Sequence, residues 1–297
     1  MLVIVGAVVV IGATLGGFLM AGGSLAVLIQ PSEFVVIGGA ALGSMLISTP
    51  MAVLKGIGAQ LGGAMGAGLT KADYVELLSL QYQVFKQVQQ GGAMSLETHF
   101  DEPAKSSILS KYPKFLKWHE ALDFLADSVK VIIVGGIAPH DLEALLDEDL
   151  KAHHDEALKP SAALAKIGDA LPGLGIVAAV LGIVITMGHI DAPPAEIGHH
   201  VGAALVGTFL GILLSYGFLQ PLAGTLEAKV NADSAYFICI KAGLLATYKG
   251  NPPAIAIEFA RRVLPHEVRP SFADTEKFCK AAAAGGAGGG ASMPAAA

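Results

Sequence analysis

Charged residues are scarce in this sequence of 297 amino acids. They make up 15% of it, whereas 53% of the residues are hydrophobic. A single soluble domain usually carries more charge and fewer apolar residues. Asp, Glu, Lys and Arg are entirely missing from four long runs, Met1–Ser32, Phe34–Leu54, Ala170–Ile190 and Ile197–Leu226. The composition therefore argues against a soluble protein.

Each charge-free run is long enough to cross a membrane. A helix needs about 20 mostly apolar residues to span roughly 30 Å of hydrocarbon. The sequence therefore predicts four transmembrane helices, Leu2–Met20, Phe34–Met51, Leu171–Met187 and Val201–Leu222. The first has no basic residue before it and three further spans after it, so we interpret it as an uncleaved span rather than a signal peptide.

Basic residues are missing from both short connectors between these spans. All 19 Lys and Arg lie in Lys55–Lys166 or in Lys229–Lys280, whereas Ala21–Glu33 and Gly188–His200 contain none. Basic segments of membrane proteins stay in the cytoplasm. We therefore expect the middle segment, the tail and both termini to be cytoplasmic, and both connectors to lie outside.

Several classes of function find no support. The two cysteines, Cys239 and Cys279, are both expected in a reducing compartment, so no disulfide is expected. The net charge of −6 gives no reason to expect nucleic acid. No Ser–His–Asp or Cys–His set is apparent, so we expect neither an enzyme nor a cofactor. A metal site outside the membrane is only a minor alternative, formed by His189, Asp191, His199 and His200.

The regions that carry the charge show helical periodicity. Apolar residues recur at helical spacing in 74–88 and in 142–150, with Pro139 near a helix start. We expect Pro160 to open a separate interfacial helix, Ser161–Asp169, that leads into the third span. The predicted fold class is all-α: an integral membrane protein with four transmembrane helices and a helical cytoplasmic domain.

This interpretation divides the chain into five segments. They are the first two spans with their outside loop, a cytoplasmic helical domain, the last two spans, a cytoplasmic helical tail, and an Ala/Gly-rich end predicted to be disordered. Their bounds are 1–54, 55–170, 171–226, 227–280 and 281–297.

Small residues and prolines mark the spans. Pro172 and Pro221 lie near the expected cytoplasmic ends of the third and fourth spans, where proline removes a backbone hydrogen bond and kinks a helix. Each is either a hinge or a tolerated membrane proline. Pairs of small residues also occur at four-residue spacing, namely Gly12 and Gly16, Gly39 and Gly43, and Gly207 and Gly211. Such pairs either promote close packing of helices or reflect the usual glycine content of membrane spans.

The predicted span interiors lack an ionisable side chain. A self-contained ion pump needs such a group at membrane depth. Either a partner supplies the carboxylate or the chain is a passive wall. Thr208 is the best candidate to face such a carboxylate, because it follows Gly207 in a stripe of small residues. Spacing alone favours the alternative in which the Thr208 hydroxyl bonds its own helix backbone.

Motifs in the spans, the tail and the middle segment match one family. The last two spans contain LPGLGIVAAVLG at 171–182 and VGTFLGILLSYGF at 206–218, and the tail contains EFARR at 258–262 and RPSF at 269–272. The middle segment adds SLE at 95–97, Pro103 and YP at 112–113. In combination these motifs resemble the MotA family of flagellar stator subunits, over nearly everything from Met1 to Lys280.

The resemblance implies a proton-conducting stator subunit in the bacterial inner membrane, which converts proton flow into torque on the rotor. It implies five copies around a dimer of a MotB-like subunit, whose single helix supplies the proton-binding aspartate. It further implies that Thr208, Ala179 and Thr186 lie along the ion pathway and that Pro172 and Pro221 take part in conformational coupling. The small apolar Ala179 resembles the proton-type members.

The same resemblance bears on the rotor. Glu97 resembles the acidic loop residue that meets the rotor's switch protein at the cytoplasmic face. The family's usual loop arginine aligns with Gln89 here, and the nearest upstream positive charge is Lys86, one helical turn away. Either Lys86 substitutes, or the rotor contact uses other charges.

Two alternatives come from other classes. A TolQ/ExbB-type energiser of outer-membrane processes has a pair of spans similar to the last two spans here, but it usually has three spans in total. The first span and the 269–272 motif argue against it. A plain scaffold without ion flow is the second. Proton conductance with and without a co-expressed partner separates the scaffold from a stator.

Overall fold

The computed structural model describes residues 2–64 and 68–283, and within these ranges the only regular secondary structure is helical. The prediction of an all-α protein is confirmed. Four helical segments are long and apolar enough to cross a membrane: Leu2–Met20, Leu25–Ser48, Pro139–Met187 and Pro194–Tyr248. The chain divides into a span unit, Met1–Ala67 with Ala157–Val230, and a helical unit, Gly68–Glu156 with Asn231–Ala297.

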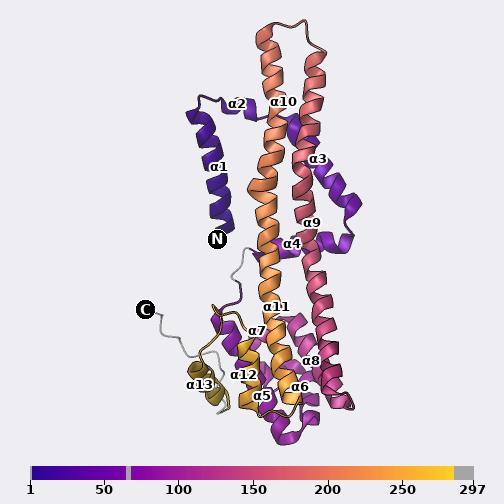
Figure 1. Ribbon diagram of the computed structural model, residues 1–297, viewed down its shortest axis with the longest axis vertical. Helices are drawn as coiled ribbons and strands as arrows, with labels where there is room; N and C mark the ends of the chain where they lie inside the picture. Colours follow the sequence, from indigo (N-terminus) through magenta and orange to yellow (C-terminus); the bar gives the residue numbers. More distant parts are fainter. Residues whose placement is uncertain (1, 65–67, 284–297) are drawn as a thin grey trace. The chain divides into compact units, whose positions relative to one another are not determined.

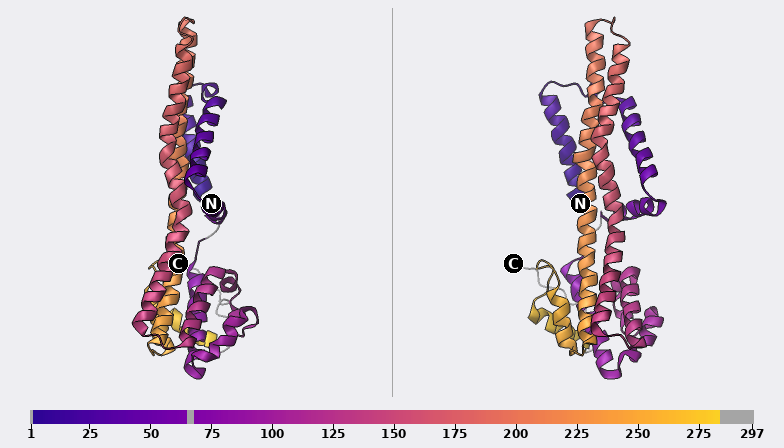
Figure 2. Two further views of the ribbon diagram at one scale, coloured as in Figure 1. Left: turned by 90° about the vertical axis from the view of Figure 1, so that its right-hand side faces the viewer. Right: turned by 45° about the vertical axis from the view of Figure 1, so that its right-hand side comes forward.

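The span unit is built around two long helices that run side by side, α9 and α10 (Figures 1 and 2). α3 contacts α10, and α1 contacts the turn η4 that follows α10. The shared core is formed by Ile37, Ala41, Ile167, Leu171, Ala178, Val206 and Leu210. The elements are α1 (Leu2–Met20), α2 (Leu25–Leu28), α3 (Pro31–Ser48), α4 (Met51–Ala64), the later part of α9 (Pro139–Met187), α10 (Pro194–Leu214), η4 (Ser215–Leu219) and the start of α11 (Gln220–Tyr248).

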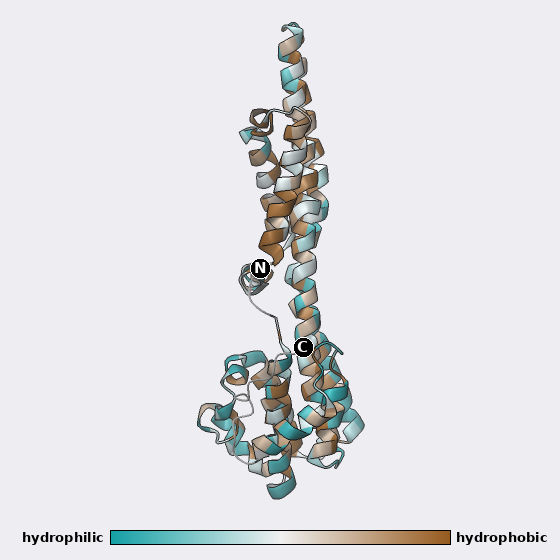
Figure 3. Ribbon diagram, turned by 90° about the vertical axis from the view of Figure 1, so that its left-hand side faces the viewer, coloured by the Kyte–Doolittle hydropathy of each residue, from teal (hydrophilic) through white to brown (hydrophobic). Residues whose placement is uncertain are grey.

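The outer faces of the span unit are apolar. α1 has no buried residue, although its side chains are nearly all hydrophobic, as its colour in Figure 3 shows. Val8 of α1, Ile47 of α3 and Val184 of α9 are all more than 60% exposed. An apolar surface of this extent marks an interaction with lipid or with other protein chains.

Prolines set the ends of the span helices. α3 begins three residues before the predicted Phe34, because Pro31 occupies a first-turn position whose missing N–H costs nothing. It ends at Ser48, and the residue before Pro50 is extended because proline disfavours a helical conformation there. α10 likewise begins at Pro194, seven residues before the predicted Val201. The first predicted span, by contrast, matches α1 residue for residue.

The predicted break at Pro160 is wrong. α9 is one helix that contains both Pro160 and Pro172, so Ser161–Asp169 is not a separate interfacial helix. The Pro160 ring packs against Gly56 of α4, where an added Cβ would come within 3.0 Å of its Cγ. The residues after Pro160 are mainly Ala, Leu and Lys, which favour helix. Helix propensity and packing together outweigh one missing hydrogen bond.

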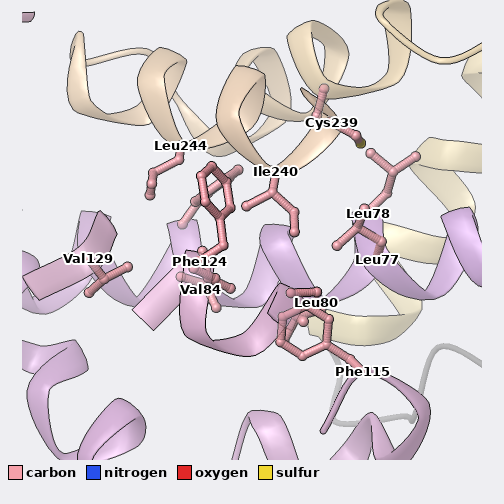
Figure 4. Packing of buried hydrophobic residues seen from close by; sticks show 14 of the residues in the cluster. Leu77, Leu78, Leu80, Val84, Phe115, Phe124, Val129, Cys239, Ile240 and Leu244 are labelled. Carbon is pink, nitrogen blue, oxygen red and sulfur yellow. The ribbon is translucent and has the colours of Figure 1, made fainter. Parts of the chain in front are cut away.

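The helical unit is arranged around α5. α12 and α13 pack against α5, and leucines and aromatics from α5, α7, α8 and α11 fill the core, among them Leu77, Leu80, Phe115 and Phe124 (Figure 4). A capping box between Thr70 and Asp73 begins α5. The elements are α5 (Lys71–Gly91), η1 (Ala93–Leu96), α6 (Glu97–Asp101), η2 (Pro103–Lys105), η3 (Leu109–Lys111), α7 (Pro113–Lys117), α8 (His119–Val134), the start of α9, the end of α11, α12 (Pro253–Arg262) and α13 (Phe272–Ala283).

The Ala/Gly-rich end was expected to be disordered from residue 281. The last helix, α13, continues to Ala283, three residues beyond the predicted boundary, because alanine favours helix. Residues 284–297 lie outside the described residues.

Candidate functional site

Glycines bring α9 and α10 into backbone contact. A Cβ on Gly211 would lie 2.5 Å from the Leu171 carbonyl oxygen and 2.9 Å from the Cα of Gly175. A Cβ on Gly175 would lie 2.7 Å from the Gly207 carbonyl oxygen. The predicted packing role of Gly207 and Gly211 is therefore confirmed. The same role is not seen within the described chain for Gly12, Gly16, Gly39 and Gly43, around which an added Cβ would meet no atom within 4 Å.

This contact brings together two of the three predicted ion-pathway residues. A Cβ on Gly207 would lie 3.2 Å from the Ala179 nitrogen, and one on Gly175 would lie 3.3 Å from the Thr208 Cα. Ala179 and Thr208 therefore lie at the same crossing of α9 and α10. Thr208 and Ala179 are both half-buried within the single chain.

The two threonine hydroxyls differ. The buried Thr186 donates a hydrogen bond to the Gly182 carbonyl at 2.8 Å, within its own helix. Thr186 lies seven residues beyond Ala179 on α9, so it is two helical turns away from the crossing that contains Ala179 and Thr208. The Thr208 hydroxyl makes no hydrogen bond with any described residue. It therefore does not bond the backbone of its own helix, which was the alternative that spacing favoured. An uncommitted hydroxyl can both donate to and accept from an incoming group.

A carboxyl group also lies at this crossing. Glu33 stands in the first turn of α3, is only 7% exposed, and presents Oε2 to Gly207, where an added Cβ would clash with it. The predicted second span began at Phe34, whereas α3 begins at Pro31, so Glu33 belongs to the helix and not to the connector before it. The sequence contained the missed signal, since Pro31 at a first-turn position places Glu33 inside the helix.

The two prolines are connected through Gln220. The Gln220 Nε2 group donates to the Ala165 carbonyl at 3.2 Å and to Asp169 Oδ1 at 2.5 Å, both one to two turns before Pro172 on α9. Pro221 immediately follows Gln220, and the preceding turn, η4, is π-helical. Proline clashes with the carbonyl four residues earlier, and a π-turn is one way to relieve that clash. Gln220 is a residue that the sequence reasoning missed, because its partners lie far away in sequence.

The residues predicted to meet the rotor lie at one end of α5. Lys86 is half-buried and Gln89 is exposed in the last turns of α5, and the exposed Glu97 begins α6. Ser95 donates to the Gln87 carbonyl at 3.3 Å, which fixes η1 and the start of α6 against α5. Neither Lys86 nor Glu97 forms an ion pair with another described residue, so both charges are available to an external partner.

The two tail motifs have a structural explanation. Arg261 donates to both oxygens of Glu258 at 2.7 Å and to the Pro270 carbonyl at 3.0 Å, and Arg262 adds a further bond to Glu258 at 2.6 Å. The hydrogen bond from Arg261 is the main reason that the pKa of Glu258 falls to about 2. Arg269 donates to the Leu264 carbonyl at 2.6 Å. The motifs therefore fix the turn between α12 and α13 rather than forming a site.

Comparisons with known proteins agree with this geometry. Residues 4–92 match the model of the motility protein A N-terminal domain, and residues 118–237 match that of the MotA/TolQ/ExbB proton channel family. Motility protein A of Escherichia coli K12 is 42% identical, over 95% of this chain and 96% of that protein.

Two solved structures have the same fold. C. jejuni MotAB aligns with a TM-score of 0.73 at 18% identity, over 91% of this chain and 98% of that one. The flagellar MotAB stator complex of Bacillus subtilis aligns with a TM-score of 0.68 at 20% identity, over 90% and 96%.

Fold and site define a multi-pass membrane protein whose paired helices α9 and α10 are held together by glycine. The chain belongs to the motility protein A branch of the MotA/TolQ/ExbB proton channel family. Its function is that of a proton-channel subunit of the flagellar stator. The match to the N-terminal model and the alignment over nearly the whole length separate it from a TolQ/ExbB-type energiser.

Proposed function

We propose that α9 and α10 form the wall of the proton pathway, with Ala179 and Thr208 at its centre and Thr186 along it. The observation that carries this proposal is the glycine contact that brings Ala179 and Thr208 to one crossing, where the Thr208 hydroxyl is uncommitted. A wall of small residues lets a partner helix approach closely. The hydroxyl then offers a hydrogen bond to a carboxyl group on that helix.

The partner is a MotB-like subunit in the inner membrane, which supplies the proton-binding aspartate on its single span. The apolar faces of α1 and α3 support assembly of several copies around that partner, and five copies around a partner dimer is the arrangement we propose. Termini, helical unit and tail lie in the cytoplasm, since all 19 basic residues fall in the two regions placed there.

The transported ion is the proton. Sodium needs several oxygen ligands in place of its hydration shell, and Ala179 supplies none. Cells driven by this stator should keep swimming at unchanged speed in sodium-free medium and should stop when a protonophore is added. The measurement is swimming speed in the two media at matched membrane potential. Loss of swimming on sodium removal alone would overturn the proposal of a proton pathway.

The two prolines couple proton transfer to movement of the protein. Pro172 and Pro221 each interrupt the backbone ladder of a pathway helix, and the Gln220 side chain links the two interrupted segments. A change of one charge in a low-dielectric site is a large energy change. The interrupted segments are where the helices can bend in response, and the bending passes to the helical unit.

Glu97 contacts the rotor's switch protein, with Lys86 in place of the family's usual arginine and Gln89 beside it. Glu97→Lys should weaken rotor engagement and reduce swimming several-fold, because it reverses an exposed charge, while proton uptake by the assembled channel stays unchanged. Asp127→Lys is the matched control, since Asp127 is an exposed acid on α8 and 74% of its side chain is accessible. Equal loss of swimming in both variants would argue against a specific contact at Glu97.

A further inference from the structure

Glu33 is the only Asp, Glu, Lys or Arg that is buried among the described residues. The helix that carries it contacts α10, and Figure 2 shows α3 running along the α9–α10 pair. We propose that Glu33 is a second proton-binding carboxyl group of the stator, carried by this chain and set in the pathway wall beside Gly207 and Thr208. The inference rests on the proposed proton pathway.

The chain leaves room for this carboxyl group at Gly207. An added Cβ at that position would come closest to Glu33 Oε2, a side-chain end that can turn away, and would also lie 3.1 Å from the Ala178 Cβ and 3.2 Å from the Ala179 nitrogen. The next residue of α10 is Thr208, the predicted pathway hydroxyl. Glycine at 207 therefore lets α9, α10 and a carboxyl group from α3 meet at one point.

No described residue forms an ion pair with Glu33 or donates a hydrogen bond to its Oε2 atom, which is buried. Residues 170–188 and 201–215, which include the contact residues Ala178 and Gly207, contain no titratable side chain, and neither does α2. Within α3, Glu33 is the only titratable residue. The nearest titratable group on α10 is His200, seven residues before Gly207.

A buried carboxylate without a donor or a cation is costly, and protonation removes most of that cost. The oxygen without a partner is therefore where a proton binds. A hydronium ion gives its proton to the carboxylate, which leaves a neutral acid and a water molecule. When the neutral acid passes that proton to the partner's carboxylate, the Glu33 carboxylate forms again and the charge balances. A residue that only fills space could be replaced by glutamine without effect, whereas a proton carrier could not.

The first test is proton uptake by vesicles that contain the chain co-assembled with its partner. Glu33→Gln keeps the size and removes the exchangeable acid, so uptake and swimming should fall by about tenfold or more, the scale of a lost proton-transfer group. Glu33→Asp keeps the acid and should retain part of the uptake. Glu196→Gln is the matched control, an exposed acid in the first turn of α10, and should leave uptake unchanged. Wild-type uptake in assembled Glu33→Gln would overturn the proposal.

The second test does not depend on transport. The infrared spectrum of the wild-type assembly with isotope-labelled glutamate should contain the C=O band of a protonated carboxyl group at neutral pH. The labelled band should vanish in both variants, and in Glu33→Asp an unlabelled band of a protonated carboxyl group should replace it. A wild-type spectrum without it would overturn the proposal even if Glu33→Gln fails to assemble. Failure of the proposed pathway has another signature, which is absence of proton uptake by the wild-type chain with its partner.

Discussion

Replacing either proline of the pathway helices should abolish torque while leaving the stator assembled. In Pro172→Ala the new N–H can donate to the Gly168 carbonyl and close the helix ladder of α9. In Pro221→Ala the clash that accompanies the π-turn Ser215–Leu219 disappears, so an ordinary helix can form there. A straighter, stiffer helix should transmit less bending. The measurement is the rotation speed of tethered cells under load, beside the amount of assembled complex.

The chain contains a matched control for this prediction. Pro160 lies in the same helix as Pro172, but its ring packs against Gly56 rather than beside the Gln220 link. Pro160→Ala should therefore keep most of the torque. If both pathway variants assemble and rotate at normal speed under load, these prolines are tolerated breaks and the hinge proposal fails.

A methyl group added at Gly211 should loosen or prevent the pairing of α9 with α10. The new Cβ would meet backbone atoms, the Leu171 carbonyl oxygen at 2.5 Å and the Gly175 Cα at 2.9 Å, which cannot turn away as a side-chain end can. Overpacking of this kind costs about 1–3 kcal/mol. Gly211→Ala should lower the thermal midpoint of the purified complex and reduce its proton uptake.

Gly202→Ala makes the same chemical change in the same helix. An added Cβ at Gly202 meets no atom within 4 Å, and alanine is the better helix former by about 1 kcal/mol. That variant should be as stable as the wild type or slightly more so. If Gly211→Ala is no less stable than Gly202→Ala, close backbone contact does not hold the pathway helices together.

Hydropathy alone predicted the helical class and the number of candidate spans. The signal was strong because about 20 consecutive apolar residues without charge are typical of a membrane-spanning helix. The ends of the helices were less accurate because local proline chemistry sets them, as Pro31 and Pro194 do here. Pro160 was misinterpreted because packing against Gly56 outweighs its intrinsic tendency to break a helix.

The candidate site was predictable only in part. The Gly207–Gly211 spacing indicated a packing face, and Thr208 followed from it. The partner of that face, Gly175 on α9, and the approach of Glu33 from α3 are tertiary contacts, which no local pattern specifies. The Gln220 link spans 51 residues to Asp169 for the same reason. The roles of Ala179, Thr186, Glu97, Lys86 and Gln89 rest on resemblance and remain predictions.

This chain is proposed to form the wall of a proton pathway that is completed by a carboxyl group of its partner, so proton uptake by vesicles should require both chains. Three preparations are compared at equal protein content: the chain alone, the chain with its MotB-like partner, and the chain with a partner whose membrane aspartate is replaced by asparagine. Uptake should appear only in the second. Equal uptake by the chain alone, or none in the complete assembly, would show that the two chains do not form this pathway together.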